Sequence, residues 1–171
     1  MVELVLSKAR VVKLTDGNIG RVKDFDCGDK DLNEFLKEDA VGHTQAKIST
    51  TYLFLYKKVP IGFFCWGMFA IKPGRDAVKK LEERGKRYGL FPAILIARFG
   101  VDKRYRGHHV GTEMIGVILG LARKISKKIE CRFVVVHSYP HVVEFYRKNG
   151  FKELKRRGKN VEMYLDLLGE F

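Results

Sequence analysis

The chain has 171 residues, 46% of them hydrophobic, with 33 Lys and Arg against 20 Asp and Glu and a formal net charge of +13. The length and the mixing of charged with apolar residues predict one globular domain over residues 1–171 and argue against an extended disordered region. The excess positive charge favours a polyanionic ligand, such as a phosphate-bearing cofactor, RNA or an acidic protein. The alternative is that a Lys-rich surface only keeps the protein soluble.

The three cysteines, Cys27, Cys65 and Cys131, are widely spaced and form no Cys-x-x-Cys pair. We therefore expect neither a disulfide framework nor a metal site. Residues 1–15 carry several charges and lack the apolar stretch of a signal peptide. The longest apolar run, residues 61–71, is about half the length needed to span a bilayer. These features predict a cytoplasmic protein with no membrane segment.

In chain order, the first half begins with a strand within residues 2–14, before a turn at residues 16–18. Apolar residues at steps of three and four then predict a helix from the N-cap Asp29 to about Lys47. The β-branched and aromatic runs 50–56 and 61–71 predict an antiparallel hairpin in the core of a sheet. Residues 73–87 are charged with a narrow apolar stripe, which predicts a surface helix closed by Gly89.

The second half alternates strands with helices. Residues 92–101 predict a strand buried on both faces, followed by a short polar turn over 102–107. Apolar residues at helical steps predict a helix that starts at Val110. A short strand at 133–136, a helix opened by Pro140 and ended by Gly150, and closing strands at 151–155 and 161–167 complete the pattern. The sum is an α/β fold with a mixed sheet.

The turn between the buried strand and the helix has the features of an anion site. Free backbone N–H groups and the helix dipole favour an anion at such a helix start. Gly107 and Gly111 lack a Cβ and let a ligand approach the backbone, while Arg104 and Arg106 can donate to phosphate oxygens. The alternative is that the glycines only shape a turn and the arginines are solvated.

This stretch resembles the acetyl-CoA-binding motif of the GNAT superfamily, Arg/Gln-x-x-Gly-x-Gly/Ala, with Arg106 and Gly111 at its first and last positions. His109 stands where the family has a middle Gly, and a positive φ costs His less than a β-branched residue. Residues 97–102 look like the fourth strand of the family, and Phe145, Tyr146, Gly150 and Phe151 look like its Phe-Tyr-x-x-x-Gly-Phe segment.

The resemblance implies a GNAT fold: a mostly antiparallel mixed sheet of about six or seven strands, flanked by helices and splayed between strands 4 and 5. It implies acetyl-CoA as cofactor. The diphosphate would lie on the turn formed by Arg104, Arg106, Gly107, His108, His109, Val110, Gly111 and Thr112. The pantetheine arm would pair like an added strand with the backbone of Phe99, Gly100 and Val101.

In similar acetyltransferases a tyrosine at the position of Tyr146 protonates the departing thiolate of coenzyme A. A phenol with a pKa near 10 can do this only when it is held within hydrogen-bond reach. The alternative for Tyr146 is an aromatic that packs on the sheet. No residue is singled out as general base, and a water chain can take the proton from an α-amino group. Candidates by residue type alone are His108, His109, His137, Asp26 and Glu144.

Within the superfamily the chain looks most like toxin acetyltransferases that modify the amino group of aminoacyl-tRNA. The residues that carry this resemblance are Phe25, Asp26, Cys27, Gly28, Leu32, Phe35, Leu36, Thr51, Tyr52, Ala97, Arg98 and Val101. This branch implies tRNA as substrate, Arg98 as a substrate-binding residue, and leaves room for an antitoxin-type partner and a homodimer. The alternatives are acetylation of a small amine or a protein amine, and a degenerate GNAT domain that binds RNA or a protein without catalysis.

Overall fold

The computed structural model describes residues 8–75, 79, 89–107 and 109–169. The chain forms two compact units. Unit 1 comprises Met1–Gly67 and Ile96–Ile115, and unit 2 comprises Met68–Leu95 and Gly116–Phe171. Most of the helix predicted over 73–87, and the first part of the strand predicted over 2–14, lie outside the described residues, as does His108.

The strands of the described residues build one mixed sheet in the order β1-β2-β3-β4-β5-β7-β6. The pairs β1–β2, β2–β3, β5–β7 and β6–β7 are antiparallel, whereas β4 and β5 are parallel. This sheet confirms the predicted fold class. The seven strands are β1 Arg10–Lys13, β2 Thr50–Tyr56, β3 Val59–Ile71, β4 Phe91–Val101, β5 Phe133–Ser138, β6 Lys152–Arg157 and β7 Asn160–Asp166.

In unit 1 the helix predicted from Asp29 forms, and the Asp29 side chain caps it by accepting a hydrogen bond from Leu32 N at 3.0 Å. The run is not a uniform α-helix. It consists of α2 (Lys30–Glu34), the π-helical η2 (Phe35–Asp39) and α3 (Ala40–Gln45), and a short 3-10 helix, η1 (Ile19–Val22), precedes it. A π-helical turn adds one residue to the spacing, often at functional positions.

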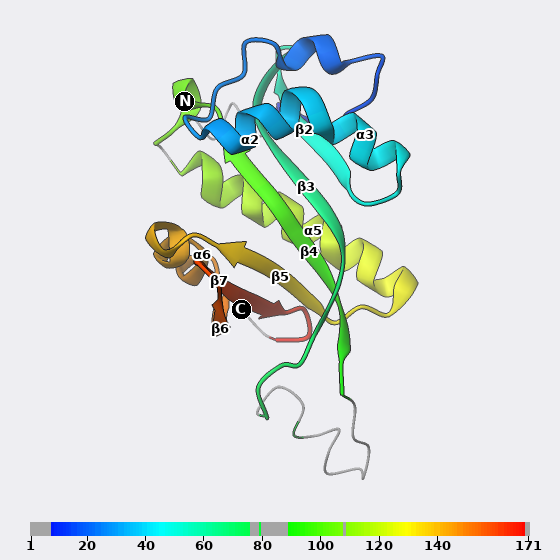
Figure 1. The fold of residues 1–171 in the computed structure, drawn as a ribbon, viewed down its shortest axis with the longest axis vertical. Helices are drawn as coiled ribbons and strands as arrows, with labels where there is room; N and C mark the ends of the chain where they lie inside the picture. Colours follow the sequence, from blue (N-terminus) through cyan, green and yellow to red (C-terminus); the bar gives the residue numbers. More distant parts are fainter. Residues whose placement is uncertain (1–7, 76–78, 80–88, 108, 170–171) are drawn as a thin grey trace. The chain divides into compact units, whose positions relative to one another are not determined.

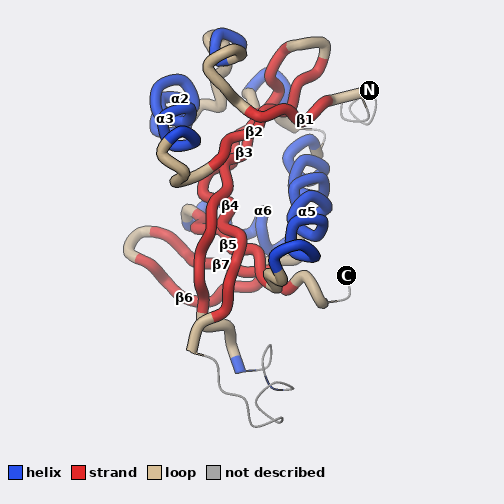
Figure 2. The backbone as a smooth tube through the Cα atoms, turned by 90° about the vertical axis from the view of Figure 1, so that its right-hand side faces the viewer, coloured by secondary structure: helices blue, strands red, loops and turns tan. Residues whose placement is uncertain are grey.

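The core of unit 1 lies between these helices and the strands. Figure 2 shows α2 and α3 on one side of β2 and β3. Their inward side chains and those of the strands form one buried cluster because helix steps of three and four meet the alternate residues of the sheet. The cluster comprises Leu14, Val22, Phe25, Cys27, Phe35, Leu36, Ala40, Leu53, Phe63 and Cys65.

Unit 2 contains most of the long helix α5 (Val110–Ile129), followed by β5, the short helices η4 (Pro140–Val142) and α6 (Val143–Lys148), and the β6–β7 hairpin (Figure 1). Pro140 opens the helical segment as predicted, and Gly150 ends it with a φ of 88° and a hydrogen bond from its N–H to Arg147 O at 3.0 Å. In the described part of the chain, no helix combines the length and apolarity that crossing a bilayer requires.

Candidate active site

The turn that leaves β4 in unit 1 is organised by Asp102, which is fully buried. Its carboxylate caps the 3-10 helix η3 (Lys103–Tyr105) by accepting from Arg104 N at 2.9 Å, and it binds the Arg104 guanidinium through Nε and NH2, both at 2.8 Å. Burial alone would raise the pKa of Asp102, but the hydrogen bonds from Arg104 outweigh burial and hold the pKa below its usual value. Asp102 is therefore an ionised anchor for the turn.

The same turn is bonded to residues 25–28, which lie 76 positions earlier in the chain. Asp102 Oδ2 accepts from Asp26 N at 3.2 Å, and Lys103 N donates to Asp26 O at 2.9 Å. The Lys103 ammonium lies 2.6 Å from the Asp26 carboxylate, and the hydrogen bond from Lys103 is the main reason why the pKa of Asp26 lies far below its usual value. Bonds in both directions fix the segment Asp26–Gly28 against the turn.

Both arginines predicted to donate to phosphate have protein partners. Arg104 holds Asp102, with half of its side chain exposed. Arg106 donates to Cys27 O, and its guanidinium nitrogens lie within 3.6 Å of the place where a Cβ on Gly28 would be. These contacts position the arginines at the turn while the outer side of each remains accessible to solvent.

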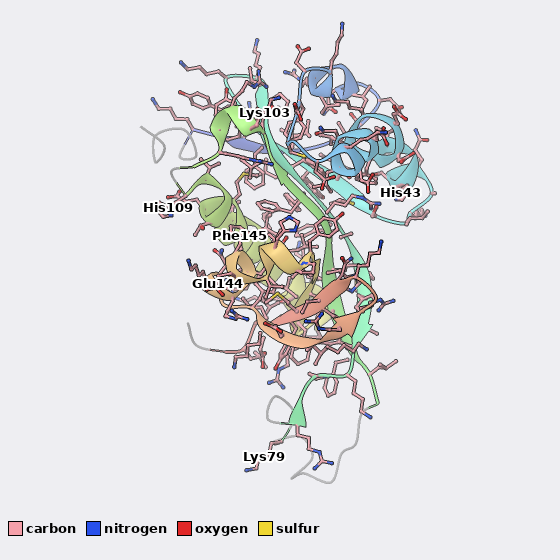
Figure 3. The ribbon with its side chains drawn as sticks, turned by 60° about the vertical axis from the view of Figure 1, so that its left-hand side comes forward. His43, Lys79, Lys103, His109, Glu144 and Phe145 are labelled. Carbon is pink, nitrogen blue, oxygen red and sulfur yellow. The ribbon has the colours of Figure 1, made fainter. Side chains whose placement is uncertain are left out.

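The backbone between η3 and α5 takes the left-handed conformation twice, at Gly107 with a φ of 80° and at His109 with a φ of 62°. His109 therefore adopts the conformation expected of the motif glycine that it replaces, at the modest cost of a non-glycine residue in that region. Both residues are exposed, and His109 lies immediately before α5 (Figure 3). The first-turn N–H groups of a helix have no carbonyl partner within it, so those of Gly111 and Thr112 suit an anion.

The predicted pantetheine strand, Phe99 to Val101, is the end of β4. Gly100 is buried there, and a Cβ on it would lie 2.8 Å from Phe63 Cε1 and 3.4 Å from Cys27 Sγ. Gly100 is thus required by close packing against the unit 1 core. This packing holds the strand end firmly, which is what pairing through backbone groups needs.

Arg98, predicted to bind substrate, also lies on β4 in unit 1. The centre of its guanidinium is 3.8 Å from the ring centroid of Phe35, in the range of a cation–π contact. Phe35 is buried and begins the π-helical segment η2. The ring of His43 meets Phe35 edge-on at 5.3 Å. The contact with Phe35 therefore holds the Arg98 guanidinium against the π-helical segment η2.

Tyr146 lies on α6 in unit 2, 8% exposed, with its ring edge-on to Phe145 at 5.2 Å and to Phe151 at 5.5 Å. Burial raises the pKa of the Tyr146 phenol well above its usual value. The phenol therefore keeps its proton at all physiological pH values. A protonated phenol can donate a hydrogen bond or a proton, and it cannot serve as a base.

Three of the described candidates for a general base lie against other charged groups, whereas His109 is exposed. Asp26 is bound by Lys103, and Glu144, on α6 beside Phe145 (Figure 3), pairs with Arg147. His137 lies 3.5 Å from the buried Glu162, and burial lowers its pKa. None of these contacts identifies a residue as the general base. Among the described residues, no group of three or more His, Cys, Asp or Glu side chains is arranged to hold a metal ion.

The sequence prediction missed the two aspartates that hold the turn. Asp102 was placed at the start of a polar turn, and Asp26 was named as a candidate base and as part of the resemblance at residues 25–28. One signal was present: aspartate is a preferred N-cap residue, and Asp102 directly precedes a turn as Asp29 directly precedes a helix. The partnership of Asp26 with Lys103 had no local signal, because it joins residues distant in sequence.

Comparison with known proteins identifies the family and the fold. The model of the acetyltransferase (GNAT) domain matches residues 51–153. No curated protein matches the sequence.

Solved structures with the same fold include a tyrosine-to-phenylalanine mutant of KacT, at 20% identity over 94% of this chain and 95% of that one, with a TM-score of 0.78. AtaT complexed with acetyl-methionyl-tRNAfMet follows at 20% identity, 91% and 93% coverage and a TM-score of 0.75. A mutant AtaT toxin bound to acetyl-CoA and the C-terminus of the antitoxin AtaR has 16% identity, 93% coverage of both chains and a TM-score of 0.73. The matched residues 51–153 make up more than half of the chain, which therefore belongs to the GNAT family of acetyltransferases.

Proposed function

We propose that the protein transfers an acetyl group from acetyl-CoA to the α-amino group of an aminoacyl-tRNA by direct attack of the amine on the thioester. The observation that carries the proposal is the turn between β4 and α5. Two exposed residues in the left-handed conformation, Gly107 and His109, precede a 20-residue helix there. Such a turn directs backbone N–H groups outward for a diphosphate.

The residues of unit 1 fit coenzyme A on this proposal. The backbone of residues 107–112 would bind the diphosphate, assisted by the outer faces of Arg104 and Arg106, and the backbone of Phe99 to Val101 would pair with the pantetheine arm. The bound thioester supplies an activated acetyl group. His109 is compatible with this role because its φ of 62° is a left-handed conformation that glycine adopts readily. The splay between β4 and β5 stays a prediction.

Tyr146 is the proposed general acid. Its buried phenol is protonated, so it can hydrogen-bond to the thiolate that leaves the acetyl group and give a proton to it, and water passes the proton that the attacking amine loses back to the phenol. The attacking amine has a reference pKa near 8, which leaves part of it neutral at pH 7. No dedicated base is required for this step.

Two features support an RNA acceptor over a small or protein amine. The net charge of +13 matches a substrate bound through many phosphates. The fold is shared with AtaT, which was solved with acetyl-methionyl-tRNAfMet, and AtaT was also solved with the antitoxin AtaR. The proposal for this chain has three parts. Its acceptor is an RNA, it has a protein partner of the antitoxin type, and residues 1–171 act as one catalytic domain.

Mass spectrometry of a charged tRNA pool incubated with the protein and acetyl-CoA tests the acceptor. We expect acetylated aminoacyl-tRNA, with polyamine and peptide amines modified far more slowly. Preferential modification of either competitor would refute the RNA acceptor and leave the acetyltransferase. Calorimetry that detects no acetyl-CoA binding would instead favour a domain that binds RNA or a protein without catalysis.

A further inference from the structure

The β6–β7 hairpin of unit 2 carries a dense row of exposed cations. β6 is an end strand of the sheet, and Leu154 is its only apolar residue. Residues 152–162 contain five basic and two acidic side chains, so the hairpin has an excess of three positive charges. The five exposed cations are Lys152, Lys155, Arg156, Arg157 and Lys159.

Two of these cations are held by a buried carboxylate. Glu162 on β7 is 1% exposed, yet it faces Arg157 NH1 at 3.3 Å and Lys155 Nζ at 3.8 Å. His137, its cross-strand partner on β5, lies 3.5 Å from the same carboxylate. More than half of the Lys155 and Arg157 side chains remains exposed. Glu162 therefore fixes the position of both cations without covering them.

An aromatic ring completes the support. The Arg157 guanidinium lies 5.4 Å from the ring centroid of Phe69, and His137 meets the same ring edge-on at 5.2 Å. A guanidinium that is stacked and hydrogen-bonded has already lost much of its rotamer freedom. Binding a phosphate then costs less conformational entropy than it would for a freely moving side chain.

Other roles for this charge fit less well. Lysines on an end strand can prevent unwanted strand pairing, but that role needs no buried carboxylate to fix them. A protein partner would find only Leu154 as an apolar contact on β6, whereas protein interfaces have an apolar centre. Nucleic-acid interfaces are polar and strongly positive. The composition and the fixed cations both favour RNA.

We propose that the exposed cations of the β6–β7 hairpin form a surface that binds the phosphate backbone of RNA, with Glu162 and Phe69 as positioning residues for Lys155 and Arg157. The inference rests on the proposed RNA acceptor and names the surface that holds it. Arg156 and Lys159 add charge at the end of the hairpin and, within the described part of the chain, make no side-chain hydrogen bond or ion pair.

The test measures binding of uncharged tRNA to the full chain over a range of KCl concentrations. The double variant Arg156→Gln with Lys159→Gln should reduce the slope of log K against log salt by about 1.4 to 1.8, because each phosphate contact contributes about 0.7 to 0.9. The matched control, Lys13→Gln with Lys23→Gln, makes the same change in net charge at exposed positions of unit 1. We expect it to leave the slope within about 0.5 of the wild-type value.

Glu162→Gln separates positioning from simple charge. The variant removes a negative charge, so general electrostatics predicts tighter RNA binding, whereas loss of positioning predicts a several-fold weaker complex. Tighter binding by a variant with an unchanged urea midpoint would overturn the positioning role. The double variant tests the surface even if Glu162→Gln fails to fold.

The results distinguish the surface from the proposed function. Equal slopes in the hairpin and control doubles, with charged tRNA still acetylated by the wild type, would overturn the surface alone. Hairpin-dependent tRNA binding without acetylated aminoacyl-tRNA would overturn the acceptor alone. A wild type that does not bind tRNA would overturn the surface. So would a hairpin double that loses binding to polyglutamate but not to tRNA, which would assign the surface to an acidic protein.

Discussion

Replacement of Asp102 by alanine should lower the free energy of unfolding by about 2 to 4 kcal/mol. The buried carboxylate accepts four hydrogen bonds, two from the backbone N–H groups of Asp26 and Arg104 and two from the Arg104 guanidinium. The alanine variant leaves the backbone donors without their acceptor. The loss falls on the turn that leads to the proposed diphosphate site, so acetyl-CoA affinity should fall as well.

The size of this loss in free energy depends on whether each hydrogen-bond donor can find water in place of the carboxylate. A backbone N–H that loses a charged acceptor inside the protein costs about 1 to 1.5 kcal/mol, and there are two. The Arg104 side chain is 49% exposed and can return to water, so its ion pair counts only as a surface pair, about 0.2 to 1 kcal/mol. For a chain of this length the sum corresponds to a drop in Tm of roughly 5 to 15 °C.

Urea unfolding and thermal melts measure the effect, with calorimetry for acetyl-CoA. Asp39→Ala is the control, since Asp39 is exposed and makes no capping bond with its side chain, and it should change stability by less than about 0.5 kcal/mol. A change that small in Asp102→Ala would refute the assigned role.

The effect of Asp102→Ala should also depend on pH. The folded-state pKa of Asp102 lies below its unfolded value near 3.9. Its contribution is therefore complete above that value and is lost as the pH falls through the folded-state pKa. The gap in stability between the wild type and the variant should accordingly be constant near neutral pH and close below about pH 4. A gap that widens on acidification would contradict the ionised anchor.

Three further variants test the remaining parts of the site. Tyr146→Phe should lower kcat by about 10² to 10⁴ and leave acetyl-CoA affinity nearly unchanged, whereas unaltered turnover would remove Tyr146 from the mechanism. Gly111→Val should weaken acetyl-CoA binding because the added side chain blocks approach to the backbone. Gly116→Val is the control, since Gly116 is exposed on the same helix with open space around it, and it should leave the affinity unchanged. Equal affinities of the two variants in calorimetry would refute the assigned loop. His109→Val should cost about 1 to 2 kcal/mol more in urea unfolding than His109→Gly, because the φ of 62° penalises a β-branched residue, and equal stabilities would argue against that backbone conformation.

The elements with strong periodicity could be predicted from the sequence. The strands β2, β3 and β4 and the helix α5 confirm the predicted positions, since alternation or helical spacing of apolar residues specifies each of them locally. The π-helical turn Phe35–Asp39 was not predicted. Its one-residue change in spacing leaves Phe35 and Leu36 buried, so the apolar pattern looks the same with or without it.

One backbone feature of the proposed site was predictable from the sequence. His109 was expected to tolerate a positive φ because it occupies a glycine position of the family motif, and its φ is 62°. The partners of Arg104 and Arg106 were not predictable from residue type. A guanidinium suits a phosphate, an aspartate or a carbonyl equally well, and which of them lies nearby depends on tertiary packing. Both arginines form hydrogen bonds within the protein, Arg104 with Asp102 and Arg106 with the Cys27 carbonyl.

The segment matched by the family model does not contain every residue that shapes the turn between β4 and α5. The family match begins at residue 51, yet Asp26 bonds to Asp102 and Lys103, and the Cys27 carbonyl accepts from Arg106. Gly28 combines a φ of 71° with a guanidinium within 3.6 Å of any Cβ placed there, so both its backbone and its lack of a side chain serve the turn. Residues 25–28 therefore act as a structural part of the loop, although they lie outside the matched segment. Substitutions at residues 25–28 should therefore disturb the proposed diphosphate site before they disturb the rest of the fold.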